Sequence, residues 1–473
     1  MCIRDRCPVI YWLREDFRIY DNLALTEAAK DNKNLILVYF SNYLDKQPGS
    51  AEEAWINNSF LEITKRYREI YGINVQCYDG DPIQYLGELH NQFSVSEIYI
   101  NEVFDPRAKK KDAKIKKHFE GQIIFKTYNS HLLFDPEEIK NNTGSYFKVY
   151  TPFWRNCLSK LTVRKPLRPP KEISVFQDKY LKDTHNLTLN YPLWTNKLFK
   201  HFTPGENAAR LKLKELGNLI KGYSNNRDFP NKESTSKFSM YFARGELSVN
   251  EVMFHLVKNK AKMNKEDYIK FSSQIGWREF SYNILYNFPN LPLRNFNQKF
   301  DNFEWDTNKK NFNLWKLGQT GFPIVDAGMR ELYETGYMHN RVRMITASFL
   351  VKDLLIDWRL GRKWFEETLL DHDIANNSAG WQWVAGSGTD AAPYFRIFNP
   401  SLQSERFDKE GNYIRKWIPE LKDLPAKLIH SPWKSHESDL KKYNIELGKT
   451  YPYPIIDHSK ARDKALMLYK KLK

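Results

Sequence analysis

Short apolar runs alternate with longer amphipathic runs between residues 9 and 128. The apolar runs are rich in β-branched and aromatic side chains, and they predict strands at Val9–Leu13, Leu35–Phe40, Ile73–Tyr78, Glu97–Val103 and Gln122–Tyr128. The runs between them place apolar side chains at helical spacing, and they predict helices at Ala24–Ala29, Ala51–Tyr71, Pro82–Phe93 and Ala108–His118. Strands that alternate with helices pair in parallel, so we expect a doubly wound α/β sheet.

The pattern changes twice after this segment. Prolines interrupt it between Asp135 and Pro204, as is typical of a connector that runs over a surface. After Gly205, helical spacing dominates and strand signals are nearly absent. We therefore expect an α/β domain at 7–134, a connector at 135–204 and an all-α domain at 205–473. Residues 1–6 continue no pattern and are left out of this prediction.

Composition and charge exclude several classes of protein. Hydrophobic residues make up 41% and charged residues 27%, which is typical of a folded globular chain. No apolar run approaches the roughly 20 residues that span a bilayer. The four cysteines form no C-x-x-C pair and no secretory signal is recognisable, so we expect a cytoplasmic protein without a disulfide framework.

Basic residues exceed acidic residues by 73 to 57, which gives a formal net charge of +16. A polyanion such as nucleic acid is therefore a plausible partner, although excess lysine also serves solubility. The basic run Arg107–Lys117 is interpreted as a solvated helix face rather than a DNA-binding patch.

Two motifs bear on nucleotide binding. The first predicted strand leads into Trp12–Asp16 instead of a G-x-G-x-x-G turn, which disfavours an ordinary dinucleotide dehydrogenase. Three hydroxyls occur in Thr235–Ser239, where a helix is expected to start. They could hold a diphosphate at the helix N-terminus, or they could serve only as a helix cap.

Two further segments place polar and aromatic side chains on helix faces. Gln274, Trp277 and Arg278 share one face, which could read and stack a base or could simply pack in a core. In the second segment Asn340 and Met344 lie one turn apart. Arg341 and Arg343 point to different sides, so one can bind phosphate while the other pairs internally.

The segment from Asp371 to Trp383 combines carboxylates, amides and tryptophans with small residues between them. This mixture suits a site where a flat polar ring lies close to the backbone. A metal is the first alternative, but consecutive helical positions fan out, so we expect no metal site. The nearby Gly386–Gly388 is interpreted as a turn.

Several of these motifs, taken in order, resemble the photolyase and cryptochrome family. The resemblance covers the chain from about Pro8 to its end and is strongest for the class I cyclobutane pyrimidine dimer photolyases. It rests on Trp12–Arg18 with Asp21-Asn22, Thr235–Ser239, Trp277–Phe280, Met338–Arg341, Asn376-Asn377, Trp381–Trp383 and Thr389–Arg396.

The resemblance implies an FAD cofactor in the helical domain and an antenna chromophore in the α/β domain. Methenyltetrahydrofolate, a deazaflavin or no antenna would all fit, and Asp105 lies near a family folate carboxylate. The implied flavin-lining residues are Tyr223, Thr235, Ser236, Lys237, Phe238, Ser239, Phe271, Arg278, Arg343, Asp371, His372, Asp373 and Asn377.

Three of these flavin residues have implied roles. Asp371 would pair with Arg343, and Asp373 would bind the edge of the flavin ring. Asn377 would face the reactive ring nitrogen and favour the fully reduced anionic flavin. The cofactor carries the redox chemistry, while the protein orients it.

The implied activity is that of a deoxyribodipyrimidine photo-lyase, a carbon–carbon lyase. Light-excited reduced FAD donates an electron to a flipped-out dimer in DNA, the cyclobutane ring splits, and the electron returns. The implied DNA-contacting residues are Arg227, Gln274, Trp277, Asn340, Arg341, Met344, Trp383, Arg396 and Gln403, of which Trp277 and Trp383 would sandwich the dimer.

Three tryptophans, Trp305, Trp358 and Trp381, match the family's chain that carries electrons to an oxidised flavin. Without the resemblance they would be interpreted as core indoles. One residue departs from the pattern, because class I enzymes commonly have a glutamate at the position of Gln274. Glutamine can hydrogen-bond a thymine edge but cannot supply a proton, so binding could survive while splitting becomes less efficient.

Three alternatives remain open from the sequence. Glutamine at position 274 also occurs in (6-4) photolyases, which pair it with histidines, whereas this chain has Asn340 and Met344. A cryptochrome-like blue-light sensor is the second alternative, disfavoured because the chain ends at Lys473 without a long signalling tail. The third is an ordinary flavin oxidoreductase. From the family we expect a monomer.

Overall fold

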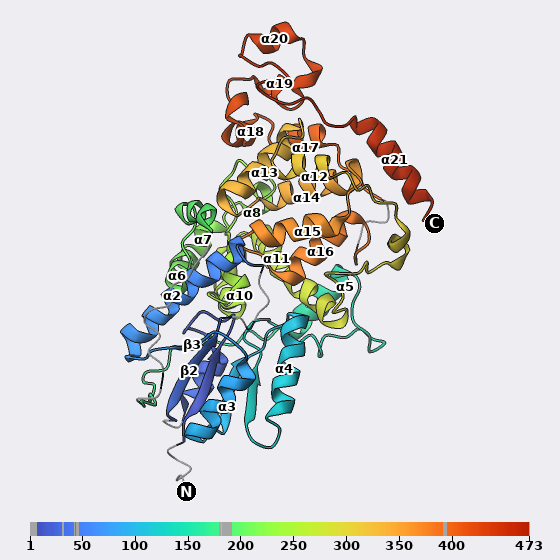
Figure 1. Cartoon of the computed structure of the whole chain (residues 1–473). Helices are drawn as coiled ribbons and strands as arrows, with labels where there is room; N and C mark the ends of the chain where they lie inside the picture. Colours follow the sequence, from blue (N-terminus) through green and yellow to red (C-terminus); the bar gives the residue numbers. More distant parts are fainter. Residues whose placement is uncertain are drawn as a thin grey trace. The chain divides into compact units, whose positions relative to one another are not determined.

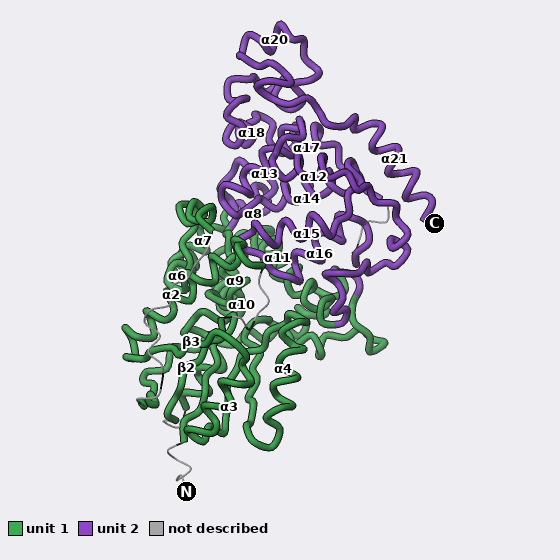
Figure 2. Tube along the Cα trace, viewed as in Figure 1, with its two compact units in different colours: residues 1–147, 151–221, 236–286 green, residues 148–150, 222–235, 287–473 purple. Residues whose placement is uncertain are grey.

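The computed structural model describes residues 7–30, 33–41, 43, 47–178, 181, 192–390 and 395–472. These residues form two compact units (Figures 1 and 2). Unit 1 contains residues 1–147, 151–221 and 236–286, and unit 2 contains residues 148–150, 222–235 and 287–473. Among the described residues, no helix has the length and apolar character that a membrane span requires.

The sheet of unit 1 has the strand order β3-β2-β1-β4-β5, and all its pairs are parallel. Its strands are β1 (Val9–Leu13), β2 (Leu35–Phe40), β3 (Gln76–Tyr78), β4 (Glu97–Asn101) and β5 (Ile124–Tyr128). The predicted parallel sheet is confirmed, and β1 and β2 begin and end as predicted. The strand β3 is shorter than predicted, because only Gln76–Tyr78 pairs with β2 while Ile73 and Val75 lie in the core.

Helices cover both faces of this sheet, as a doubly wound fold requires. Side chains such as Tyr11 and Leu13 face α1 (Leu23–Ala28) and α2 (Ala51–Tyr71). The alternate side chains, such as Ile10 and Trp12, face α3 (Pro82–Phe93) and α4 (Pro106–His118). Both faces of β1 and β2 are buried, which explains their continuous apolar sequences.

The remaining helices that lie wholly or mainly in unit 1 are α5 (Tyr150–Lys160), η3 (Leu193–Lys200), α6 (Glu206–Lys214), α7 (Leu216–Leu219), α9 (Ser239–Ala243), α10 (Val249–Asn259), η4 (Lys260–Lys262) and α11 (Lys265–Asn287). Long-range polar contacts tie this part of the chain to the segment that follows β1. The Glu206 carboxylate accepts from the backbone N–H groups of Ile19 at 3.0 Å and Tyr20 at 2.8 Å. The Arg18 guanidinium donates to the Gly245 carbonyl at 2.7 Å. The compact units therefore do not coincide with boundaries at 134 and 204, which stay predictions about domains.

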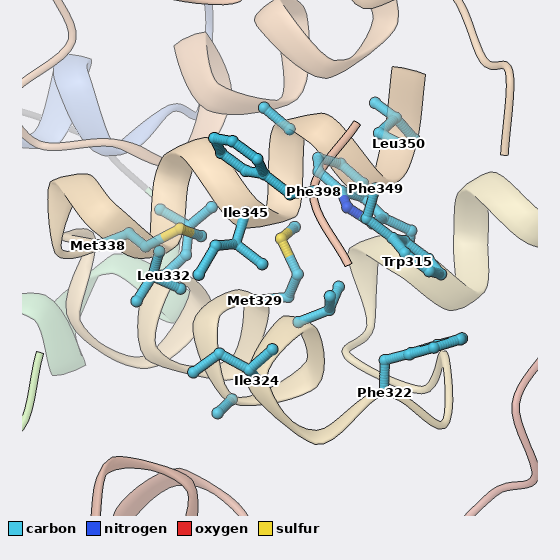
Figure 3. Close-up of a cluster of buried hydrophobic side chains, with 14 of the residues drawn as sticks. Trp315, Phe322, Ile324, Met329, Leu332, Met338, Ile345, Phe349, Leu350 and Phe398 are labelled. Carbon is cyan, nitrogen blue, oxygen red and sulfur yellow. The ribbon is translucent and has the colours of Figure 1, made fainter. Parts of the chain in front are cut away.

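Unit 2 is helical, as predicted for the C-terminal part of the chain. Its helices are α8 (Tyr223–Asn226), η5 (Gln298–Asn302), α12 (Lys309–Lys316), α13 (Pro323–Thr335), α14 (Asn340–Ser348), η6 (Phe349–Asp353), α15 (Trp358–Thr368), α16 (Ile374–Ala385), α17 (Pro400–Phe407), α18 (Asn412–Trp417), η7 (Pro419–Leu421), α19 (Ala426–Ile429), η8 (Pro432–Lys434), α20 (Glu437–Lys441) and α21 (His458–Lys470). Its core contains Met329 of α13 and Ile345 of α14 (Figure 3).

Close helix packing in unit 2 depends on particular small residues. A Cβ atom on Gly328 of α13 would lie 2.4 Å from Val342 of α14. After α14 the chain continues as the π-helical turn η6 and then reaches Leu355, whose φ is 56°. π-helical turns frequently mark functional sites, because they shift the direction of the side chains that follow.

Candidate functional site

A partly buried ion pair joins α14 to the segment before α16. Nη2 of Arg343 donates to both carboxylate oxygens of Asp371, at 3.0 and 2.9 Å. Nε of Arg343 donates to the Met338 carbonyl at 2.7 Å, which fixes the guanidinium plane. Burial acts to lower the pKa of Arg343, but Asp371 and Tyr337 outweigh it and the pKa is raised. The predicted pairing of these two residues is confirmed.

The first turn of α16 presents an amide with a fixed orientation. Asp373 caps the helix by accepting from the Asn376 N–H at 2.8 Å. Nδ2 of Asn377 donates to the Arg362 carbonyl at 3.0 Å. No described residue donates to Oδ1 of Asn377. The amide therefore offers an open acceptor, as an N–H group of a bound ring would require. His372 is buried beside this turn.

The segment with three hydroxyls is not an ordinary helix cap. The helix α9 begins at Ser239, and its N-cap residue Phe238 makes no capping bond through its side chain. Lys237 has a φ of 54°, a left-handed conformation that turns the chain just before the helix. Thr235 belongs to unit 2, where its hydroxyl interacts with Tyr337, and the residues from Ser236 to Ser239 belong to unit 1.

Arg278 of α11 is buried in unit 1 and is oriented by His131. Its Nη1 donates to the His131 carbonyl at 3.1 Å, and its Nη2 lies 2.7 Å from Nε2 of the same histidine. Burial, together with the Arg278 charge, lowers the pKa of His131, so this ring is neutral and can accept. Nε of Arg278 is buried without a hydrogen-bond partner among the described residues. Phe271 is buried two turns earlier on α11.

The other two predicted residues on α11 are half-buried. Nε2 of Gln274 donates to the Lys270 carbonyl at 3.2 Å, while its Oε1 accepts no hydrogen bond from a described residue. Trp277 makes an edge contact with Phe280 at 5.9 Å between ring centroids. Between them, Gly276 packs tightly, since a Cβ atom there would lie 2.5 Å from the Trp154 ring.

Two predicted DNA-contacting arginines in unit 2 come together around one carboxylate. Nη2 of Arg341 lies 3.1 Å from Asp228, and Nε of Arg227 lies 3.6 Å from the same side chain. Asn340 is exposed, and its Nδ2 lies 3.9 Å from Sδ of Met344. Because Arg341 pairs with Asp228 and Arg343 with Asp371, the prediction that they point to different sides is confirmed.

The remaining DNA-contact predictions fall on the C-terminal end of α16 and the segment after it. Nε1 of Trp383 donates to the Asp390 carbonyl at 3.2 Å. Trp383 and the exposed Arg396 line one cavity in unit 2. Gln403 is half-buried on α17, and no described contact joins its side chain to either of them.

The three predicted relay tryptophans all lie in unit 2 without direct ring contacts among them. Trp381 is 3% exposed, and its ring lies against α15, where a Cβ atom on Gly361 would come within 2.2 Å of it. Trp358 begins α15 one turn before Gly361 and is fully buried. Trp305 is half-buried, and the Asp306 N–H that follows it donates to the Leu355 carbonyl at 2.7 Å. Burial thus increases from Trp305 to the other two.

Two residues to which the sequence assigns no role of their own contact this part of the chain. Gln382 lies in sequence between Trp381 and Trp383. Its Nε2 donates to the carbonyls of Leu291 and Arg294 at 2.7 and 2.8 Å. Trp315 makes an edge contact with Trp381 at 6.2 Å. The position of Gln382 between two tryptophans could have indicated its importance from the sequence. No sequence feature near Trp315 indicates its contact with Trp381.

The switch point of the sheet, at the ends of β1 and β4, holds a polar network in unit 1. Asp16 accepts from the Tyr11 hydroxyl at 2.5 Å and also bonds to Asn101. Arg14 forms an ion pair with Asp112 at 2.6 Å. Nε of Arg14 is buried without a hydrogen-bond partner among the described residues. The antenna chromophore stays a prediction. Asp105 caps α4.

Among the described residues, no group of three or more histidine, cysteine or acidic side chains is placed to hold a metal ion. Arg278 in unit 1, and Arg343, Asp371 and Asn377 in unit 2, carry charges and hydrogen-bonding groups that an organic cofactor can use.

Comparison with known proteins agrees with this arrangement. Residues 9–171 match the family model described as DNA photolyase, and residues 271–471 match the model described as the FAD binding domain of DNA photolyase. A deoxyribodipyrimidine photo-lyase of Agrobacterium fabrum is 41% identical over 98% of this chain and 98% of its own length. Cryptochrome-1 of Arabidopsis thaliana is 33% identical, over 98% of this chain and 70% of its own length.

The solved structure of a bacterial class III photolyase from Agrobacterium tumefaciens aligns with 99% of this chain and 98% of its own, with a TM-score of 0.93 and 40% identity. The two family models flank an unmatched middle segment and account for the sheet of unit 1 and for α11 together with most of unit 2. The chain therefore belongs to the DNA photolyase family and has its FAD-binding domain.

Proposed function

We propose that this chain repairs cyclobutane pyrimidine dimers in DNA, driven by light. The main support for this proposal is that α14 presents different residues on two of its sides. One side of α14 holds Arg343 in its ion pair with Asp371. Another side presents the exposed Asn340 beside Met344, with Arg341 near Arg227. The helix α14 can therefore contribute residues both to the FAD site and to DNA binding.

The chain's own groups fit FAD. When bound, FAD supplies an electron to the dimer on illumination and takes it back after the ring has split. The open Oδ1 of Asn377 can accept an N–H of the isoalloxazine ring, and the buried Nε of Arg278 needs an acceptor that no described residue provides. Asp371 would hold Arg343 in position, and Asp373 would hold the first turn of α16 in position.

The tryptophan array supports a route for electrons to the cofactor. Trp305 is the most exposed of the three, and it is joined to the segment before Trp358 through the Asp306–Leu355 hydrogen bond. Trp358 precedes the glycine on which Trp381 packs. We infer that electrons pass inward in this order.

The proposed DNA contacts combine charge with stacking. Arginines at positions 227, 341 and 396 would neutralise phosphates and give a salt-dependent affinity. Trp277 and Trp383 are half-buried, so part of each indole can stack on a base. Base–aromatic stacking contributes about 1–3 kcal/mol per base.

Replacing Trp277 by alanine tests the stacking role. We expect affinity for a dimer-containing duplex to fall about 5–150-fold, which corresponds to about 1–3 kcal/mol, while affinity for undamaged DNA changes little. Fluorescence anisotropy with both duplexes measures this. The matched control is Ile269→Ala, on the same helix at a side chain 53% exposed, which should leave both affinities unchanged. Equal losses for both duplexes in Trp277→Ala would show that the indole only packs α11.

The subgroup is part of the proposal. The motif resemblance favours class I, whereas 40% identity to a class III photolyase across almost the whole chain favours class III, which we adopt. Gln274 would bind the dimer through hydrogen bonds without supplying a proton.

The match to a cryptochrome keeps a blue-light sensor as the second candidate. A methenyltetrahydrofolate or deazaflavin antenna, a monomer and a cytoplasmic location stay predictions.

A further inference from the structure

A small cavity in unit 2 contains a buried lysine that the proposed repair reaction does not use. The cavity is lined by residues that include Lys352, Trp383, Phe395, Arg396 and Tyr469. Its interior volume is about 30 Å³, enough for one water molecule or one oxygen atom of a larger group but too small for a base. Arg396, one of the residues that line the cavity, is exposed, so part of the lining reaches solvent.

Lys352 enters this cavity from the π-helical turn η6 and is 4% exposed. Its Nζ donates to the Arg396 carbonyl and lies 4.5 Å from the centroid of the Phe395 ring. No described residue accepts a second hydrogen bond from this ammonium group. An ammonium has three donors, so the geometry leaves room for an acceptor that comes from outside.

The charges around Lys352 leave the cavity favourable for an anion. Arg396 carries a second positive charge toward it. The acid that acts on Lys352 is Asp353 on the same turn. Its Oδ1 is bound to Nδ1 of His458 on α21, and its Oδ2 has no hydrogen-bond partner among the described residues. Tyr469, also on α21, adds a phenol to the lining. Burial, followed by the Arg396 charge, lowers the pKa of Lys352 to about 7.

We propose that this cavity binds an anionic phosphate oxygen of the DNA backbone and that Lys352 takes up one proton from solvent when it does so. Trp383 and Arg396 belong both to this cavity and to the proposed DNA contacts, so the inference rests on the proposed function. A phosphate oxygen beside Lys352 stabilises the charged ammonium, since opposite charges a few ångströms apart favour the charged form.

The pH dependence follows from this proton. The pKa of Lys352 is about 7 in the free protein and is higher once an anion is bound. At pH values between these two pKa values, the protein–DNA complex carries more protons than free protein and free DNA together. The affinity for DNA therefore falls as pH rises. The fall is at most about tenfold per pH unit for one proton.

Proton uptake in the wild-type holoprotein is the primary test. Isothermal titration calorimetry with an undamaged duplex, in two buffers of different ionisation enthalpy, counts the protons taken up. We expect uptake that approaches one proton at about pH 8 and is much smaller at about pH 6. Uptake near zero at both pH values would overturn the proposal. Undamaged DNA is used because its phosphates test the cavity independently of the lesion. If the same protein showed no preference for dimer-containing DNA, repair would be refuted but the measured proton uptake would still stand.

Variants assign the proton to Lys352. Lys352→Met should remove the uptake and lower the salt dependence of DNA affinity by about one phosphate contact. Lys352→Arg, which stays charged, should keep the affinity and lose the uptake. The control Lys449→Met, at an exposed lysine of unit 2, should behave like wild type. Unchanged uptake in Lys352→Met with retained fold, checked by circular dichroism, would contradict the assignment.

Inorganic phosphate distinguishes the source of the anion. If phosphate alone raises the melting temperature of wild type but not of Lys352→Met, while DNA binding takes up no proton, the cavity binds a free anion and the DNA assignment is wrong. If DNA binding takes up the proton and added phosphate competes with it, the DNA assignment holds.

Discussion

Replacing Trp381 by phenylalanine should slow photoreduction of oxidised FAD by about 100-fold, equivalent to about 2.7 kcal/mol of barrier. The phenyl ring keeps the packing against α15, where Gly361 leaves room for the larger indole, but it is much harder to oxidise. Absorbance changes of the flavin under blue light, with an external reductant present, measure the rate. Repair by chemically reduced protein should be spared, because the electron for the dimer then comes from FAD already reduced.

The control for this variant is Trp315→Phe. The Trp315 ring makes an edge contact with Trp381 at 6.2 Å between centroids and stacks on Phe365 of α15 at 6.3 Å. No described ring contact joins it to Trp358 itself, which is the residue before Trp381 in the proposed route. We expect its photoreduction rate to stay near that of wild type. Normal photoreduction in Trp381→Phe would remove Trp381 from the route. Loss of photoreduction in Trp315→Phe with a normal Trp381→Phe would redirect the route through Trp315.

Replacing Asp371 by asparagine should lower the free energy of unfolding by about 3 kcal/mol and release FAD. Removing one partner of a buried ion pair typically costs about 3–5 kcal/mol, because the remaining charge is left without compensation. We place the loss at the lower end because the Arg343 side chain is 23% exposed. Denaturant unfolding measures the stability, and the fluorescence of released flavin measures retention.

A surface pair provides the matched comparison. Asp463 lies 3.4 Å from Arg462, and its side chain is 70% exposed. Asp463→Asn should change stability by less than about 1 kcal/mol. If Asp371→Asn were equally mild and retained FAD, Arg343 would not depend on Asp371 and the flavin site would need a different organisation.

Much of the fold could be predicted because its signals are local. The strands β1 and β2 are buried on both faces, so each appears as an uninterrupted apolar run with clear ends. The helix α2 begins after Ser50, which caps it, and ends at Tyr71, just before Gly72, whose φ is 69°. The compact units were not predictable in this way. They depend on contacts such as that of Arg18 with Gly245, which join residues far apart in the sequence.

The site was predictable only where family motifs name the residue. Arg343 and Asp371 were expected to pair, and they do. His131, which orients Arg278, follows a strand and belongs to no motif. Lys352 looks like an ordinary helical lysine in sequence, and its burial arises from the π-helical turn and the packing of Phe395. The conformation of Lys237, with a φ of 54°, also gave no local signal.

Light-driven repair is measured with a thymine-dimer oligonucleotide and the purified, reduced, FAD-bound protein under blue or near-ultraviolet light, with a dark control. We expect light-dependent restoration of intact thymines, no restoration in the dark, and a repair efficiency that rises in Gln274→Glu. Absence of repair in the light, despite bound and fully reduced FAD, would contradict the proposed function and would favour a (6-4) substrate or a light sensor.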